Sequence, residues 1–401
     1  MADSKIGSTI KLYDKDAYAT EFDAKVISCL KITDGEYKGA NKVLLDKTLF
    51  FPEEGGQEAD LGTLNQGQVL DVLIENIDGK QLIYHIVRGD VAEGDNVHGV
   101  IDWTHRFDQM QQHSGEHIFS GTVHNLYGYD NVGFHLSKQV VTMDFNGPLD
   151  DDQVLDIERK VNEVIIRNLE ILISWPSKNE LEKLEYRSKK ELDGDVRIVT
   201  IPGVDVCACC APHVRRTGEI GFLKVLGRQN YKGGVRIWIE CGLRALNTLD
   251  KEHTLIQNLA ESLTTAVENV PMQVDKIKDE LFLVKGSLQK TRAQLLEYKL
   301  KSIPEDQKNV TVFTEDIDNK SVQNAINALT QTHGGFCSFF IKTETGYRFV
   351  SGIADGDARK VASTLRDKFG AKGGGSEKMV QGSLLEVDED KIKTAIDEIE
   401  D

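Results

Sequence analysis

Two histidines lie four residues apart in the segment His113-Ser-Gly-Glu-His117. At 3.6 residues per turn, side chains with this spacing project from one face of a helix, one turn apart. One helix can then supply two imidazole ligands to a tetrahedral zinc ion. The same spacing also occurs on ordinary polar helix faces, so the pair alone leaves a metal site and a solvated face as alternatives.

A second group of possible ligands follows further along the chain. Three thiols and one imidazole, from Cys207, Cys209, Cys210 and His213, lie close together in the sequence. Zinc takes cysteine as thiolate and histidine as neutral imidazole, so two ligands from this segment would complete a set of four. The spacing leaves all three sulfurs open, and a chance cluster of buried thiols is the other interpretation.

The helix pair also fits a different chemistry. His113-x-x-Glu116-His117 matches the inverted-zincin pattern, in which Glu116 would be the general base of a metallopeptidase. That interpretation requires a later glutamate as the third ligand and gives the cysteine cluster no role. We therefore rank the metallopeptidase as the second hypothesis.

The elements that must position these residues indicate an α+β multidomain fold. Short β-branched and aromatic runs separated by Asp34-Gly35 and Asp78-Gly79 predict β-structure first, and helical and strand-like segments mix afterwards. We expect a β-barrel module at residues 1–92, a zinc-binding α/β domain at residues 93–245, a helical coiled-coil linker at residues 246–304 and an α/β domain at residues 305–401.

The linker carries a regular apolar pattern. Pro271 divides it, which predicts two long helices rather than one. Apolar positions in the second helix recur at alternating steps of three and four, as in a coiled-coil seam. The pattern fits an intramolecular hairpin and a dimerisation stalk equally, and we expect a homodimer through this helix or through the C-terminal domain.

Charge and composition limit the partners. The 401 residues carry a formal net charge of -17, so a nucleic-acid partner needs a local basic surface. Arg228, Lys232 and Arg236, beside the cysteine segment, could contact phosphates, although a solvated charged face is the alternative. With no apolar leader and no membrane-length apolar run, we expect a cytoplasmic protein without a membrane partner.

The ligand pattern resembles a known family. His113-x-x-x-His117 followed by Cys209-x-x-x-His213 is similar to the editing domain of alanyl-tRNA synthetase and to the free-standing AlaX-type editing proteins. The family's later motif continues into a strand that reads Thr-Gly-Glu-Ile-Gly, as at Thr217–Gly221 here. The resemblance selects Cys209 as the sulfur ligand, although Cys-Ala-Pro precedes His213 where the family more often has Gly-Gly-Thr.

Further segments agree in order along nearly the whole chain. The Gly-Gly-Gln segment at 46–57, Asp60-Leu-Gly62 and Asp102-Trp-x-x-Arg106 are all similar to the family's motifs. Gly373–Gly382 resembles the glycine-rich loop of the DHH-associated C-terminal domain of the long AlaX proteins. No counterpart of the synthetase's aminoacylation domain is expected, so the chain should not charge tRNA.

The resemblance implies a zinc-dependent hydrolase with one zinc ion per chain that deacylates mischarged tRNA(Ala). Ser-tRNA(Ala) is the expected substrate, with Gly-tRNA(Ala) as a further possibility. A non-catalytic RNA-binding or oligomerisation module with a structural zinc ion is the remaining alternative.

The resemblance also assigns roles to pocket residues. Gly55 and Gly56 would let the backbone approach the substrate, and Gln57 would bond the aminoacyl group or the water. Thr48 would contact a serine hydroxyl or be an ordinary strand residue, and Glu116 would orient a zinc-bound histidine or face solvent.

Overall fold

The computed structural model describes residues 7–138, 140–188, 196–315 and 317–399. The chain divides into two compact units, Met1–Ile256 and Gln257–Asp401. Helices and strands mix in both units, which confirms the expected α+β class. In the described ranges no helix combines the length and the apolar character needed to cross a bilayer.

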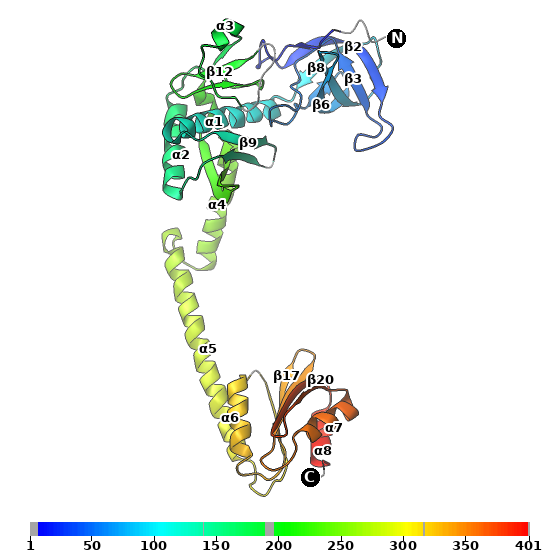
Figure 1. Ribbon diagram of the computed structural model, residues 1–401, viewed down its shortest axis with the longest axis vertical. Helices are drawn as coiled ribbons and strands as arrows, with labels where there is room; N and C mark the ends of the chain where they lie inside the picture. Colours follow the sequence, from blue (N-terminus) through cyan, green and yellow to red (C-terminus); the bar gives the residue numbers. More distant parts are fainter. Residues whose placement is uncertain (1–6, 139, 189–195, 316, 400–401) are drawn as a thin grey trace. The chain divides into compact units, whose positions relative to one another are not determined.

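The first unit begins with a closed six-stranded barrel, drawn in blue in Figure 1. Its strands alternate buried and exposed side chains, as in β2, where Phe22, Ala24 and Val26 point inward. The order around the barrel is β2 (Glu21–Lys31), β3 (Asn41–Leu45), β7 (Lys80–Arg88), β6 (Gly67–Ile77), β5 (Gly62–Leu64) and β8 (Asn96–Ile101). This confirms the expected N-terminal barrel. A short parallel pair, β1 (Ile10–Lys11) and β4 (Lys47–Thr48), accompanies it.

The rest of the first unit is built around helix α1 (Trp103–Tyr127), which packs against helix α2 (Asp151–Ile166). A four-stranded antiparallel sheet has the order β14 (Leu223–Tyr231), β15 (Gly234–Cys241), β10 (Val141–Phe145) and β9 (Asn131–Leu136). A smaller sheet contains β11 (Leu172–Ser174), β12 (Ile198–Ile201) and β13 (Asp205–Ala208), and a short helix α3 (Lys178–Leu181) lies nearby in the sequence.

Helix α1 carries both histidines of the His113–His117 pair. Asp102 caps its N-terminus by accepting a bond from the His105 amide, and Gly128 ends it in the left-handed conformation. Nearly every residue from His105 to Val123 is buried, polar residues included. Because burying polar side chains is costly unless they are bonded, a buried polar helix indicates a functional element.

A buried ion pair joins the barrel to α1. The Arg106 guanidinium, fully buried, donates to both carboxylate oxygens of Asp60 and also to the carbonyls of Ala17 and Leu49. Both charges are therefore paired and hydrogen-bonded, as a buried ion pair requires. The pair links the two motifs, Asp60-Leu-Gly62 and Asp102-Trp-x-x-Arg106, that stood apart in the sequence.

Two helices follow, α4 (Gly242–Ser262) and α5 (Val270–Lys301), with a single turn of 3₁₀-helix at Val267–Asn269. Pro271 lies in the first turn of α5, where its missing N–H leaves no bond unmade. Apolar side chains of the expected seam are exposed along α5, among them Ile277, Leu281, Leu288 and Leu295.

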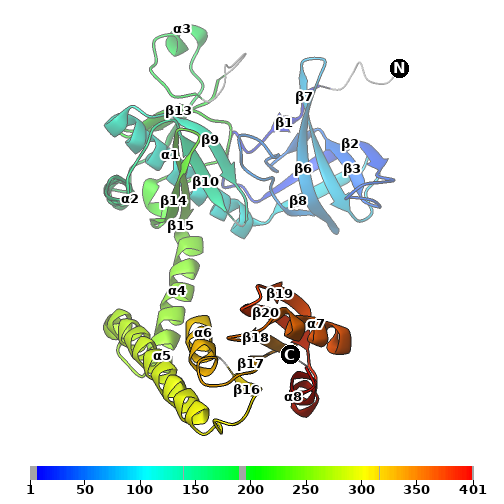
Figure 2. The ribbon, with the colours of Figure 1, turned by 60° about the horizontal axis from the view of Figure 1, so that its bottom comes forward.

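The C-terminal part of the second unit is a five-stranded sheet with three helices, in orange and red in Figure 2. Its order is β16 (Val310–Glu315), β17 (Cys337–Thr343), β18 (Gly346–Gly352), β20 (Met379–Leu385) and β19 (Lys372–Gly375). The helices are α6 (Asn319–Leu329), α7 (Arg359–Phe369) and α8 (Glu389–Asp397).

The glycine-rich segment of this unit is a hairpin rather than the expected loop. Residues Lys372–Gly375 pair antiparallel with Val380–Ser383. A Cβ at Gly373 would lie 2.3 Å from the carbonyl oxygen of Gln381, so the glycine lets the two backbones approach closely.

Candidate functional site

The four residues of the two histidine and cysteine motifs meet at one place. His113 and His117 lie on α1, and Cys209 and His213 lie in the segment after β13. One ligand atom from each lies within 4.8 Å of all the others. Cys209 Sγ is 3.5 Å from His113 Nε2 and 3.4 Å from His213 Nε2. Three imidazole nitrogens and one sulfur in this arrangement suit a tetrahedral zinc ion.

Each imidazole is held from behind through its Nδ1 atom. His113 Nδ1 donates to Gln57 Oε1 at 2.8 Å, and His117 Nδ1 donates to Asp205 Oδ2 at 2.8 Å. His213 Nδ1 lies 3.2 Å from Ser114 Oγ. Such bonds fix the ring orientation and leave Nε2 for a metal ion.

The protonation states of the clustered cysteine and histidines also favour binding of a cation. Burial alone would raise the pKa of the Cys209 thiol, but the facing imidazoles of His113 and His213 hold it well below its usual range. Burial lowers the pKa of His213 to about 3. At His117 burial opposes protonation, but the Asp205 carboxylate outweighs it and raises the pKa, so a metal ion would displace a proton there.

The structure distinguishes the three neighbouring cysteines. Cys207 lies with His117 and Asp205, but Arg187 donates two bonds to the Asp205 carboxylate at 2.7 and 2.9 Å. The guanidinium thus occupies the position that a cation would need. Burial raises the pKa of Cys207 to about 11 and raises that of Cys210 as well. Only Cys209 combines a low pKa with the three imidazoles.

The Gly-Gly-Gln segment of the barrel closes over this cluster. Gly55 and Gly56 are exposed and have φ values of 65° and 86°. A Cβ at Gly56 would lie 2.6 Å from the Phe134 carbonyl oxygen on β9, and the Gly56 carbonyl accepts a bond from Leu136. The absence of a side chain at Gly56 therefore lets the turn pack against β9, a role that the sequence did not indicate.

The two residues expected to act in catalysis are both buried at the cluster. Gln57 bonds His113 through Oε1, while its Nε2 atom has no partner. Glu116 does not face solvent: its Oε1 atom accepts bonds from Ser120 and Asn131, at 2.7 and 2.6 Å. Its Oε2 atom lies 4.0 Å from His117 Nε2, so the carboxylate borders the cluster.

Thr48 lies fully buried in the barrel region and already has partners. Its hydroxyl is 2.8 Å from His85 Nε2 and accepts a bond from the Phe50 amide at 3.0 Å. His85 Nδ1 faces the Val43 carbonyl at 3.3 Å, so Nε2 is the acceptor and Thr48 donates its proton to it. Burial lowers the pKa of His85 to about 4 and keeps it neutral.

Two of the three candidate phosphate contacts are already engaged. Arg236 on β15 forms two bonds to Asp144, at 2.6 and 2.7 Å, and Arg228 on β14 donates to Asp151. Lys232 lies at the tip of this hairpin, 5.0 Å from the Tyr231 ring centre. The acids offset part of the positive charge that the sequence suggested, and Lys232 is left as the cation available to a phosphate.

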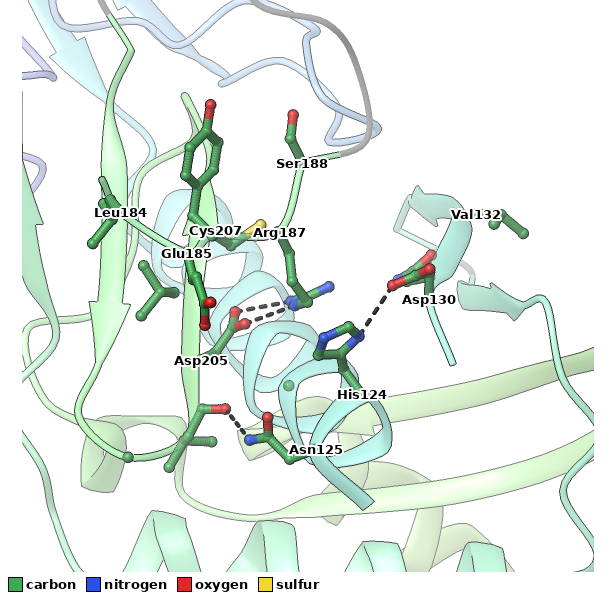
Figure 3. A pocket seen from close by; sticks show the side chains of 16 residues that line it. His124, Asn125, Asp130, Val132, Leu184, Glu185, Arg187, Ser188, Asp205 and Cys207 are labelled. Atoms are coloured by element: carbon green, nitrogen blue, oxygen red, sulfur yellow. Dashed lines mark hydrogen bonds and ion pairs between the residues drawn. The ribbon is translucent and has the colours of Figure 1, made fainter. Parts of the chain in front are cut away.

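Sequence reasoning missed the residues behind the ligands, above all Asp205 and Arg187. Both also line a cavity of about 1070 Å³ formed by α1, β9 and residues 184–188 (Figure 3). Figure 3 shows Arg187 reaching Asp205 across this cavity, with His124 bonded to Asp130 on its other side. None of the four cluster residues lines the cavity, but Asp205, which does, bonds His117 of the cluster.

Comparison with known proteins finds two families of aminoacyl-tRNA synthetase domains that match parts of the chain. Residues 196–237 match the family model described as "Threonyl and Alanyl tRNA synthetase second additional domain". Residues 5–105 match that described as "tRNA synthetases class II (A)".

Individual relatives identify the family of the chain more closely than the family models do. The chain is 27% identical to alanyl-tRNA editing protein AlaX-L of Pyrococcus horikoshii, over 97% of this chain and 98% of that protein. It is 31% identical to alanyl-tRNA editing protein Aarsd1 of Rattus norvegicus, over 71% of this chain and 70% of that protein. It matches alanine–tRNA ligase of Ignicoccus hospitalis at 30% identity but spans only 40% of that ligase's length. The chain belongs to the alanyl-tRNA editing protein family.

Proposed function

We propose that this chain hydrolyses the ester bond of mischarged tRNA(Ala) and does so with one zinc ion held by His113, His117, Cys209 and His213. The family's editing proteins support aminoacyl-tRNA deacylation as the activity and tRNA as the partner. The observation that carries the zinc assignment is the convergence of these four ligand atoms within 4.8 Å. The fully buried, hydrogen-bonded imidazoles make this a prepared site.

An aminoacyl ester is intrinsically reactive, so the protein mainly has to place the ester and a water molecule together. Gln57 is suited to this because its Oε1 atom is committed to His113 and its Nε2 atom can donate to the ester carbonyl or the water. Glu116 borders the cluster and acts as a positioning residue for His117. A bound zinc ion with four protein ligands supplies a closed centre that holds the pocket walls in place.

Serine is the preferred amino acid in this proposal. Because the Thr48 proton is donated to His85, the Thr48 oxygen can accept a further bond from a substrate hydroxyl. A site built to bond a hydroxyl discriminates strongly against a substrate that lacks it, so alanine would be spared. The chain would then remove serine from tRNA(Ala) and protect the fidelity of translation.

Replacing the sulfur ligand tests the zinc assignment. Cys209→Ser should lose bound zinc and lower the rate of Ser-tRNA(Ala) deacylation by about 100-fold or more, because the thiolate anchors the set of four. Cys207→Ala, two residues away, should keep both zinc and activity. Zinc content by mass spectrometry and release of radiolabelled serine are the two readouts.

A reversed result, with zinc lost in Cys207→Ala and kept in Cys209→Ser, would contradict the assignment. If Cys209→Ser lost zinc without losing activity in a folded protein, zinc would not be needed for the reaction. If the wild type bound tRNA and zinc but released no serine, the chain would be the non-catalytic module.

The metallopeptidase alternative has less support. It needs a glutamate as third ligand, whereas the groups around His113 and His117 in the described residues contain cysteine, histidine and aspartate. The proposed assembly is a homodimer, because exposed apolar residues recur along α5 at coiled-coil spacing.

Lys232 is the proposed phosphate contact of the β14–β15 hairpin.

A further inference from the structure

Tyr13 Oη, Glu54 Oε2 and Gln57 Nε2 are among the buried polar atoms near the cluster that have no hydrogen-bond partner. Tyr13 is 3% exposed and Gln57 is fully buried, so the solvent does not satisfy these atoms. An unpartnered buried polar atom costs folding free energy, and such atoms in a native protein call for an explanation. A ligand that supplies the missing partners is one.

The three atoms belong to one neighbourhood. Glu54 and Gln57 close a tight turn through two backbone bonds, and Gln57 reaches His113 at 2.8 Å. A Cβ at Gly55, between them, would lie 3.6 Å from Cys210 Sγ, beside the ligand Cys209. Burial first, then the nearby Asp14, Glu54 and Cys210, raises the pKa of Tyr13 well above its usual value. The Tyr13 ring packs against Phe51, three residues before Glu54, with 5.4 Å between the ring centroids.

The Glu54 carboxylate has no cation to balance it. No ion pair joins it to a lysine or arginine in the part of the chain that the structure describes. The buried Arg197 guanidinium donates through Nη1 to the carbonyls of Cys209 and Ala211, and its Nε atom has no hydrogen-bond partner. Gly55 and Gly56, between the Glu54 and Gln57 side chains, are exposed.

The free atoms match the two polar ends of an aminoacyl ester. Gln57 Nε2 is a donor and suits the ester carbonyl, whereas Glu54 Oε2 and Tyr13 Oη can accept bonds from a cation. The amino acid of a charged tRNA carries an α-ammonium group two bonds away from that carbonyl carbon. We propose that Glu54, assisted by Tyr13, binds the α-ammonium group of the esterified amino acid, an inference that rests on the proposed deacylase function.

The test removes the carboxylate charge from the protein and the ammonium charge from the substrate, each without the other. Zinc-loaded wild type, Glu54→Gln and the control Glu53→Gln, whose side chain is exposed, would be assayed on two substrates. One is Ser-tRNA(Ala), and the other is 3-hydroxypropionyl-tRNA(Ala), which differs from it only in lacking the α-ammonium group. Comparing variants on each substrate cancels the different intrinsic reactivities of the two esters.

We expect Glu54→Gln to lower kcat/KM for Ser-tRNA(Ala) by about 10-fold or more and to change that for the deaminated substrate by less than about twofold, as loss of a charged hydrogen bond predicts. Tyr13→Phe should show a smaller loss with the same selectivity, and Glu53→Gln should match the wild type. Zinc content and thermal midpoint would verify that each variant is folded. If Glu54→Gln is unstable, Tyr13→Phe carries the test.

Equal losses on both substrates, or no loss on either, would overturn this inference while leaving deacylation itself established. A wild type that cleaves neither ester would overturn the proposed function, and the ammonium site with it. The two failures are therefore distinguishable from the wild-type rates alone.

Discussion

At the scale of single residues, the candidate site consists of four clustered His and Cys side chains and the groups that hold them. The spacing of the histidines is itself a signal in the sequence, whereas Cys209 is selected over Cys207 and Cys210 only by the resemblance to the editing family. The partners of the histidines could not be predicted, because Asp205 and Ser114 reach His117 and His213 only through the packing of β13 and its following segment against α1. Nothing in the sequence near Asp205 marks it as different from other acidic residues.

Thr48 illustrates the same limit. The resemblance to the editing family pointed to it, but its bond to His85 depends on strand β7 lying beside β3 in the barrel. His85 thereby becomes a buried neutral histidine whose protonation would break the bond that it accepts from Thr48.

Stability should therefore depend on pH through His85. Its folded pKa of about 4 lies below the unfolded value of 6.5. Between these values the unfolded chain binds the extra proton, so stability is full above pH 6.5 and falls as the pH drops toward 4. The shift corresponds to about 3 kcal/mol.

His85→Gln should remove that dependence. Urea unfolding of the first unit at pH 7.5 and pH 4.5 would show a smaller difference for the variant than for the wild type, with other titrating groups cancelling in the comparison. Identical pH dependence in both proteins would mean that His85 is not the titrating group.

At the scale of elements, the sequence was most informative about the helices. The spacing of His113 and His117 predicted a helix, and α1 spans both residues; Pro271 predicted two helices in the linker, which are α4 and α5. Strand β10 was missed although Val141, Met143 and Phe145 alternate with more exposed residues. Strand β19 gave no such signal, since a run of glycines reads as a turn.

The close approach of β13 to α1 is the contact on which the cluster depends most. At Gly121, one turn beyond His117, an added Cβ would lie 2.6 Å from the Val204 carbonyl oxygen and 2.7 Å from Asp205 Cβ. Since backbone atoms cannot easily move aside, the helix and the segment before β13 would have to separate.

Gly121→Ala should therefore destabilise the first unit by about 1–3 kcal/mol, as overpacking does. Gly286→Ala is the matched control, because it also lies inside a helix but meets nothing within 4 Å. That change should stabilise α5 by about 0.5–1 kcal/mol. Calorimetric unfolding would measure both, and a Gly121→Ala protein as stable as the wild type would contradict the close packing.

At the scale of the whole molecule, the negative net charge opposes binding of the proposed tRNA substrate. A net charge of -17 repels tRNA, and both Arg228 and Arg236 are already paired with carboxylates. Substrate recognition must then depend on local contacts and on the amino acid in the pocket. This makes selectivity for the attached amino acid the property that best distinguishes an editing enzyme from a module that merely binds RNA.

The most direct test of the account is the deacylation rate of the zinc-loaded chain on Ser-tRNA(Ala) relative to Ala-tRNA(Ala) under identical conditions. A pocket that bonds the serine hydroxyl predicts a kcat/KM ratio of about 100 or more in favour of the seryl ester. Equal rates on the two substrates, or no release of serine above the uncatalysed rate, would contradict it.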